Sequence, residues 1–230
     1  LQASNKLSLA EICFRKALAL RDDPAIHHHL GEILRANLKY AEAEKHLLIT
    51  TKAFPNEARA WYNLALVYVG MNRIEEAIKA NELSTKFEPN IADIKFQRSL
   101  LYFFAGEYQK AFDMYEYRLQ TQNGKLNMPE PPWDGKNLQG KTLHVYCEQG
   151  FGDVIQFIRF LPLLPRDGKI IITVPKELRR LIENSFPLAH VEYYNHGVDN
   201  PPCDYSISIG SIPRFTLKGQ PSGEPYLIAP

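Results

Sequence analysis

The sequence contains little cysteine. Its three cysteines, Cys13, Cys147 and Cys203, are an odd number, and no two of them have the C-x-x-C spacing of redox and metal sites. A disulfide-stabilised secreted domain is therefore not expected, and a reduced, cytoplasmic setting fits better. Cys147 lies in an apolar run, where cysteine usually acts as a small core residue rather than as a reactive thiol.

Charge of one sign is not in excess, and long apolar runs are missing. Lys+Arg number 27 and Asp+Glu number 26, a net charge of +1, whereas a nucleic-acid binder normally has a basic excess. No apolar run approaches the roughly 20 residues of a membrane-spanning helix, and no charged-then-apolar leader is recognisable. We expect neither a nucleic-acid partner nor a membrane span. The chain begins with Leu1 rather than methionine, as a piece of a longer product would.

The first half of the sequence repeats with a period of 34 residues. Ala43, Ala77 and Ala111 are each 34 positions apart, and Pro55 and Pro89 have the same separation. A similar four-residue segment ends at each alanine: YAEA, IEEA and YQKA. A period of this length indicates helical hairpins, which bury their apolar faces only by stacking on one another.

One copy carries large and small residues in the pattern of tetratricopeptide repeats: Trp61, Leu64, Ala65, Tyr68, Ala77 and Pro89. The resemblance covers roughly residues 6–120. It implies one leading helix followed by about three helical hairpins, in a repeat domain at residues 1–122. Small residues such as Gly31, Ala65 and Ser99 let the two helices of a hairpin approach each other closely.

Tetratricopeptide arrays generally bind extended peptides on the concave face formed by the first helix of each hairpin. The resemblance therefore implies a set of peptide-binding residues: His29, Arg59, Tyr62, Asn63, Phe96 and Gln97. The same face also carries His28, Glu32, Arg35 and Asp93. In O-linked N-acetylglucosamine transferases, which join such repeats to a sugar-transfer domain, asparagines form a ladder at one of these positions; only Asn63 keeps that identity here. The alternative is that the repeats are a structural spacer or a dimer surface.

Three consecutive histidines, His27, His28 and His29, suggest a metal site. Consecutive residues on a helix point in three directions, so the three rings cannot converge on one ion. His27 occupies the position of the tetratricopeptide tryptophan and is expected to pack in the core. The sequence predicts no metal site and no cofactor.

A proline-rich connector at residues 123–140 ends the helical pattern. Its central segment, residues 128–135, reads MPEPPWDG, and proline cannot extend a helix. Trp133 is too apolar to remain exposed and is expected to anchor the connector to one domain.

The second half alternates strands and helices. Strand patterns occupy residues 142–147, 169–174, 191–194 and 205–209, with helical patterns at 153–164 and 176–184. This order predicts a parallel, Rossmann-like sheet at residues 141–230. Ligands of such sheets bind outside the carboxyl ends of the strands, often at the turn after the first strand.

That turn is glycine-rich. Gly150 and Gly152 lack a Cβ atom, so we expect a sharp turn that lets a ligand approach the backbone. The pattern is a poor dinucleotide motif, because Ile155 replaces the third glycine and the second strand ends in Val174-Pro175-Lys176 without an acidic residue.

The segments EQGFGDVIQF (148–157) and RFLPLL (159–164) resemble bacterial glycosyltransferases of the heptosyltransferase-like family, especially their tetratricopeptide-fused branch. The resemblance covers nearly all of residues 133–230 and implies the amino-terminal, acceptor-handling half of a GT-B fold. It implies that Asp153 is the general base that deprotonates an acceptor hydroxyl. Asp153 could equally cap the helix without any catalytic role. The remaining residues assigned to substrate binding are Gln149, Gly150, Phe151, Gly152, Gln156 and Arg159.

The overall prediction is an α plus α/β chain: a tetratricopeptide array followed by half of a GT-B glycosyltransferase. The sequence ends at Pro230, before any second half that could hold a sugar nucleotide, so we expect no sugar transfer by the chain alone and sugar-nucleotide binding only together with that half. Protein or peptide partners are expected on the repeats. The alternative function is a non-catalytic protein–protein interaction scaffold.

Overall fold

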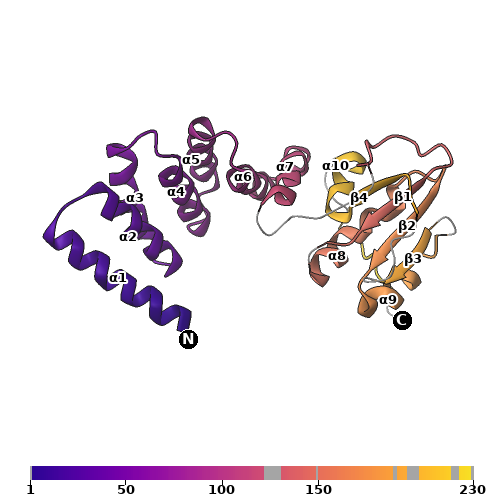
Figure 1. Ribbon diagram of the computed structural model, residues 1–230, viewed down its shortest axis with the longest axis horizontal. Helices are drawn as coiled ribbons and strands as arrows, with labels where there is room; N and C mark the ends of the chain where they lie inside the picture. Colours follow the sequence, from indigo (N-terminus) through magenta and orange to yellow (C-terminus); the bar gives the residue numbers. More distant parts are fainter. Residues whose placement is uncertain are drawn as a thin grey trace. The chain divides into compact units, whose positions relative to one another are not determined.

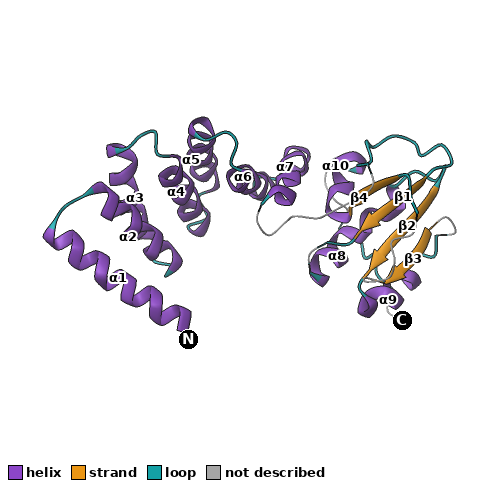
Figure 2. Ribbon diagram, in the orientation of Figure 1, coloured by secondary structure: helices purple, strands orange, loops and turns teal. Residues whose placement is uncertain are grey.

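The computed structural model describes residues 2–121, 131–148, 150–188, 191–195, 202–218 and 223–228. The chain divides into two compact units, Leu1–Thr121 and Gln122–Pro230. The first unit is helical and the second contains a parallel sheet (Figures 1 and 2). The predicted fold class, α plus α/β, is confirmed.

The first unit consists of a leading helix followed by helical hairpins that pack in chain order. The leading helix is α1 (Gln2–Leu20). The hairpins are α2 (Pro24–Ala36) with α3 (Tyr40–Ala53), α4 (Ala58–Gly70) with α5 (Ile74–Phe87), and α6 (Ala92–Phe104) with α7 (Tyr108–Tyr115), which runs into the short helix η1 (Glu116–Gln120). The 34-residue period therefore corresponds to one hairpin.

Small residues bring the helices of a hairpin together. Gly31 on α2 lies directly against Leu47 on α3: a Cβ atom built on Gly31 would be 2.7 Å from Leu47 Cγ, closer than real Cβ contacts. Ala65 and Ala77, from the second hairpin, are fully buried in the same apolar core. Any larger side chain at these positions would push the helices apart.

The turn inside each hairpin uses one left-handed residue at the same repeat position. These residues are Leu38 (φ 61°), Asn72 (φ 59°) and Gly106 (φ 75°). In the first turn, the N–H of Lys39 donates to the carbonyl of Leu34 at 2.8 Å, and the equivalent bond recurs in the other two turns. This is the Schellman pattern that ends a helix and satisfies its last carbonyl groups.

The second unit is built on a four-stranded sheet of order β3-β2-β1-β4, in which all neighbouring strands are parallel. The strands are β1 (Thr142–Tyr146), β2 (Lys169–Val174), β3 (Val191–Asn195) and β4 (Tyr205–Ser208), shown as adjacent arrows in Figure 2. Their bounds agree with the predicted strands to within one residue. Ile170 to Val174 are all buried, as expected for a strand with both faces covered.

The helix after β1 differs from the prediction. It begins at Phe151 as α8 (Phe151–Phe157) and tightens into the 3-10 helix η2 (Ile158–Leu163), which contains Pro162. Proline lacks the N–H that an α-helical bond requires. The later helices are α9 (Lys176–Ser185), η3 (Ile209–Ser211) and α10 (Ile212–Thr216).

Residues 131–140, which the sequence assigned to a connector, pack against the sheet of the second unit. The N–H of Trp133 donates to the carbonyl of Ser206 on β4, and the N–H of Ser206 donates to the carbonyl of Pro131, both at 2.9 Å. The Trp133 ring is buried, lies 5.3 Å from the Phe215 ring, and donates its Nε1–H to the carbonyl of Lys136 at 2.8 Å. Trp133 therefore belongs to the second unit.

Among the described residues, none of the helices combines the length and the apolar character that crossing a bilayer demands.

Candidate functional sites

The first helices of the hairpins carry two adjoining cavities. One has a volume of about 290 Å³ and the other about 300 Å³, and Glu32 on α2 and Arg59 on α4 contribute to both. The first is lined by Ala25, His28, His29, Glu32, Thr50, Phe54, Glu57 and Arg59. The second is lined by Glu32, Arg35, Arg59, Tyr62, Asn63, Ile91, Asp93 and Ile94. We call this pair of cavities the groove.

Two arginines, Arg35 and Arg59, line the groove together with three acidic residues, Glu32, Glu57 and Asp93. No ion pair joins Arg35 or Arg59 to an acidic group of the described residues. The Arg35 Nε atom is also buried without a hydrogen-bond partner among those residues. A buried donor without an acceptor is costly, so a ligand that supplies an acceptor there is favoured.

Glu32 is the most heavily engaged acid of the groove. Its Oε1 accepts a hydrogen bond from Asn63 Nδ2 at 2.8 Å and lies 3.4 Å from His28 Nε2. Its Oε2 is 3.2 Å from His29 Nδ1. The hydrogen bond with His28 contributes most to lowering the pKa of Glu32 to about 2, and the bonds from Asn63 and His29 lower it further while burial opposes them. Glu32 is therefore a carboxylate at neutral pH.

The structure brings together some of the predicted peptide-binding residues and not others. His29, Arg59, Tyr62 and Asn63 line the groove, whereas Phe96 and Gln97 line neither cavity. Gln97 is only 4% exposed, and its Oε1 accepts a hydrogen bond from Asn81 on α5 at 2.8 Å.

Phe96 instead lies 5.8 Å from the ring of Tyr115 on α7. Repeat position alone could not reveal these partners, because they come from a different helix.

The three histidines are divided between two roles. His27 is buried, as expected, with its Nδ1 2.6 Å from His46 Nδ1 and its Nε2 2.8 Å from Asp22 Oδ1. His28 and His29 lie on the groove beside Glu32. The three rings do not converge on one point. The rings of His28 and His29, however, both lie beside the Glu32 carboxylate, which is not one of the consecutive residues.

In the second unit, the predicted glycine turn lies at the point where the strand order reverses. β1 pairs with β2 on one side and with β4 on the other, and α8, which follows β1, packs against η3, which follows β4. Parallel sheets bind ligands at this kind of switch point. Gly150, Phe151 and Gly152 are exposed there, while Gln149 lies outside the described residues.

The turn does not require glycine for its backbone angles, and the approach of a ligand to the backbone stays a prediction. Gly150 has φ −86°, an ordinary value for any residue, and Gly152 does not have a positive φ. Of the residues that the structure describes, none would contact a Cβ atom built on Gly152, and one built on Gly150 would reach only Asp153 Oδ2, 4.0 Å away. The backbone itself therefore does not need glycine, and the space beside the turn is open.

Asp153 is the third residue of α8 rather than its N-cap, which is Gly150. Its Oδ2 accepts a hydrogen bond from the Gly150 N–H at 3.4 Å, a long and weak contact, and its side chain is partly exposed. Gln156, further along α8, is exposed. Cys147, before the turn, is buried, and burial raises the pKa of its thiol far above the ordinary value, so it is an inert core residue.

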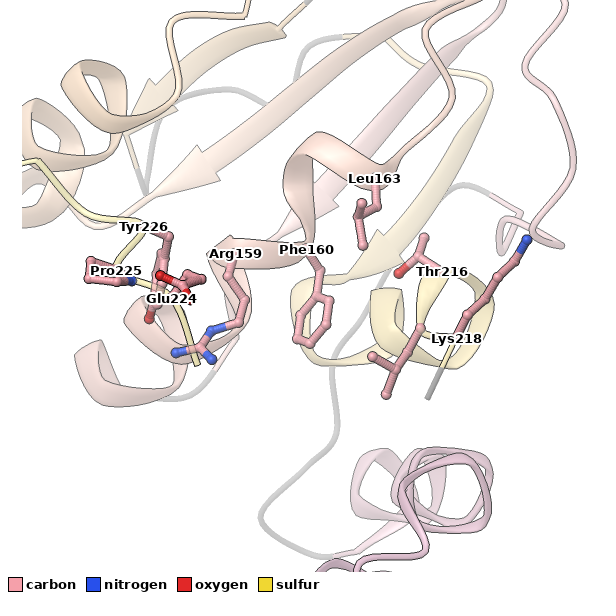
Figure 3. Close-up of a pocket in the computed structure, with 9 residues that line it drawn as sticks. Arg159, Phe160, Leu163, Thr216, Lys218, Glu224, Pro225 and Tyr226 are labelled. Atoms are coloured by element: carbon pink, nitrogen blue, oxygen red, sulfur yellow. The ribbon is translucent and has the colours of Figure 1, made fainter. Parts of the chain in front are cut away.

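A cavity of about 470 Å³ lies alongside η2 (Figure 3). It is lined by Arg159, Phe160, Leu163, Thr216, Leu217, Lys218, Glu224, Pro225 and Tyr226. The Arg159 guanidinium lies 4.2 Å above the Tyr226 ring, and the Tyr226 hydroxyl donates to the carbonyl of Ile155 at 2.6 Å. Of the described residues predicted to bind substrate, only Arg159 lines this cavity; neither Asp153 nor the glycines do.

Comparison with known proteins supports the repeat array. Residues 58–91 match the family described as tetratricopeptide repeat. The chain is 27% identical over 147 residues to Protein FlbA of Caulobacter vibrioides, covering 60% of this chain and 25% of FlbA. It is 32% identical over 82 residues to Hsp70-Hsp90 organizing protein 3 of Arabidopsis thaliana, covering 36% and 15% of the two chains. The sequence thus spans a quarter or less of the length of either relative.

Two solved structures were matched to the chain. A mutant O-GlcNAc transferase of Thermobaculum terrenum matches with a TM-score of 0.50 and 13% identity, over 87% of this chain and 40% of the transferase. MamA of Desulfovibrio magneticus RS-1 matches with a TM-score of 0.48 and 22% identity, over 52% and 68% of the two chains. The match to the transferase includes residues of both units, and at this identity it shows the fold alone. The chain is a tetratricopeptide-like helical array joined to a small parallel sheet.

Proposed function

We propose that the repeat array binds an extended segment of a partner protein in the groove, and that this segment carries a carboxylate. The single observation behind the proposal is that Arg35 and Arg59 both line the groove, with neither in an ion pair to an acidic group of the described residues. Of the three acids that line the groove with them, Glu32 already accepts from Asn63 and faces two histidines, and Glu57 accepts from the backbone N–H of Arg59. An incoming carboxylate therefore finds two arginines that can donate to it.

The groove can be tested with a library of random peptides that have free carboxyl termini. We expect acidic peptides to be enriched on the wild-type chain. Because a hydrogen bond to a charged group contributes about 1.5–3 kcal/mol, Arg59→Glu should weaken the selected peptides by about 10- to 100-fold. Fluorescence polarisation of labelled peptides measures this change in Kd.

Lys45→Glu is the matched control. It makes the same charge reversal at an exposed position of α3 that lines neither cavity. If no peptide is enriched, the groove is not a peptide-binding site. The same follows if the Arg59 and Lys45 variants lose affinity equally.

We also propose that the second unit is the acceptor-side half of a glycosyltransferase, to which the repeats bring a protein or glycan acceptor. Three observations support this proposal: the resemblance of residues 133–230 to heptosyltransferase-like enzymes, the exposed glycine turn at the switch point of the sheet, and the shared fold with an O-GlcNAc transferase. The chain would act in the cytoplasm, where nucleotide sugars are the donors.

In this proposal Asp153 accepts the proton of the acceptor hydroxyl as that hydroxyl attacks the anomeric carbon of the donor sugar. Among the described residues, the weak bond from the Gly150 N–H engages only Asp153 Oδ2, which leaves Oδ1 available. The open space beside Gly150 and Gly152 allows an acceptor to approach the backbone. Gln149, Phe151 and Gln156 would orient the acceptor.

Arg159 contributes a positive charge from the neighbouring cavity. The phosphates of the donor would be bound by a second half of the enzyme.

The enzyme proposal is tested on the protein as its gene encodes it, with a panel of nucleotide sugars and detection of released nucleoside diphosphate. We expect transfer, and we expect Asp153→Asn to lower kcat by about 10²- to 10⁴-fold, the usual contribution of a general base. The melting temperature should not change, since the side chain is partly exposed and makes a single long hydrogen bond.

Asp134→Asn serves as the control, because it makes the same chemical change at an exposed residue of the same unit. If Asp153→Asn retains full activity, the residue only caps α8. If no nucleotide sugar is consumed, the scaffold function is favoured instead.

A further inference from the structure

Two imidazoles and one carboxylate come together on one turn of α2. Within the part of the chain that the structure describes, His28, His29 and Glu32 each offer one ligand atom, and these three atoms lie within 4.8 Å of one another. Glu32 follows His29 by three positions and His28 by four, the separations that place side chains on the same helix face. This explains how two adjacent histidines can serve a single centre.

We propose that His28, His29 and Glu32 bind a divalent transition-metal ion, with Zn²⁺ as the best match. Two imidazoles and one carboxylate are a donor set used by zinc sites that keep a position open for water or substrate. Bonds from zinc to nitrogen or oxygen are about 2.0–2.2 Å long, so two donors of one tetrahedral ion lie about 3.3–3.6 Å apart. A pair at the 4.8 Å limit would have to close by roughly 1.4 Å, which rotation of the side chains can supply.

The neighbours of these residues orient them for such a role. Asn63 Nδ2 donates to Glu32 Oε1 at 2.8 Å and holds the carboxylate from a second helix. The ring of His29 stacks on the ring of Phe14 on α1, with centroids 5.6 Å apart and planes 29° apart. Outer contacts of this kind fix the orientation of metal ligands and strengthen binding.

The cavity beside the cluster provides room for the rest of the coordination sphere. His28, His29 and Glu32 all line the 290 Å³ cavity of the groove, so water can reach an ion held there. The rings now lie within hydrogen-bond distance of Glu32, at 3.2–3.4 Å. On binding, each ring nitrogen that faces the ion donates its lone pair to the metal, and any proton it carried moves to the other nitrogen of the ring or to solvent.

The experiment is isothermal titration of the metal-free chain with Zn²⁺ alone, in a Cys13→Ser background because the exposed Cys13 thiol could bind zinc by itself. We expect one equivalent of Zn²⁺ to bind. His29→Ala and Glu32→Gln should each weaken binding at least tenfold. Because His29 is 55% exposed, the metal-free His29→Ala chain should keep the melting temperature of the parent. Electron paramagnetic resonance of the Cu²⁺-loaded chain should show coupling to two nitrogen atoms, and to one after His29→Ala.

His46→Asn is the control histidine variant, since His46 lies in the same unit but outside the cluster. It should retain the zinc stoichiometry and affinity of the parent. Absence of zinc binding by the parent chain, unchanged affinity in His29→Ala and Glu32→Gln, or an equal loss in His46→Asn would each overturn the assignment. No peptide is present in the titration, so its outcome is separate from that of the peptide-binding experiment.

Discussion

Replacing Leu47 with alanine should destabilise the repeat array by about 2–5 kcal/mol, towards the upper end of that range. Leu47 is fully buried, and its side chain fills the space opposite Gly31, which has no side chain of its own to move into the gap. The cavity left behind should therefore collapse little. Urea unfolding followed by far-ultraviolet circular dichroism measures the loss, because most of the helix of the chain belongs to the array.

Leu48→Ala is the matched control, with the same chemical change one residue later on α3. Leu48 is 43% exposed, so its truncation should change the free energy of unfolding by about 1 kcal/mol or less. Equal effects for the two leucines would contradict the packing described here.

A double-mutant cycle makes the test sharper. Gly31→Ala alone should be unfavourable, because its new Cβ atom would lie 2.7 Å from Leu47 Cγ. When Leu47 is already alanine, that same methyl group fills part of the cavity. The double variant should therefore be more stable than the sum of the two single effects predicts, by about 0.5–3 kcal/mol. Strict additivity would show that the two side chains do not touch.

The second large effect is expected for Trp133→Ala, which should destabilise the sheet unit by about 3–5 kcal/mol. The ring is buried against Phe215, and its indole N–H donates to the carbonyl of Lys136. Its backbone joins the segment 131–140 to β4 through Ser206. Hydrogen exchange of the β1 and β4 amide groups measures the change in stability.

Two comparisons interpret the Trp133 result. Trp133→Phe keeps an aromatic ring but removes the donor to Lys136, so it should cost clearly less than alanine. Trp61, on α4, is the other tryptophan of the chain, and its fluorescence in the Trp133→Ala variant should report an unchanged array. Unaltered exchange in β4 after Trp133→Ala would mean that the segment is not anchored as described.

Much of the fold could be predicted because its signals are local and repeated. The alanines at 34-residue spacing and the apolar strand runs each determine one element, and the observed hairpins and strands follow them closely. The start of α8 was missed because Gly150 serves as its N-cap in place of the expected acidic residue. The interruption at Pro162 could have been foreseen from proline chemistry, but the helical spacing of its apolar neighbours concealed it.

The candidate sites were less predictable, because they depend on contacts between elements. The repeat position predicted a binding role for Gln97. Its side-chain oxygen, Gln97 Oε1, already accepts a hydrogen bond from Asn81 on a neighbouring helix. The run of three histidines does not by itself indicate Glu32, which lies one helical turn later and comes close to His28 and His29. For Asp153, the resemblance predicts a general base, a role that the activity of Asp153→Asn tests.

The three left-handed turn residues have a consequence for how the array can evolve. The backbone keeps one conformation at positions 38, 72 and 106, while the residue changes from leucine to asparagine to glycine. Glycine adopts this conformation freely and asparagine tolerates it, but a leucine there is strained by about 1 kcal/mol. Strain thus decreases from the first hairpin to the third. Replacing Leu38 with a residue that tolerates this conformation should therefore stabilise the first hairpin. That gain in folding free energy can offset a destabilising substitution made elsewhere for binding.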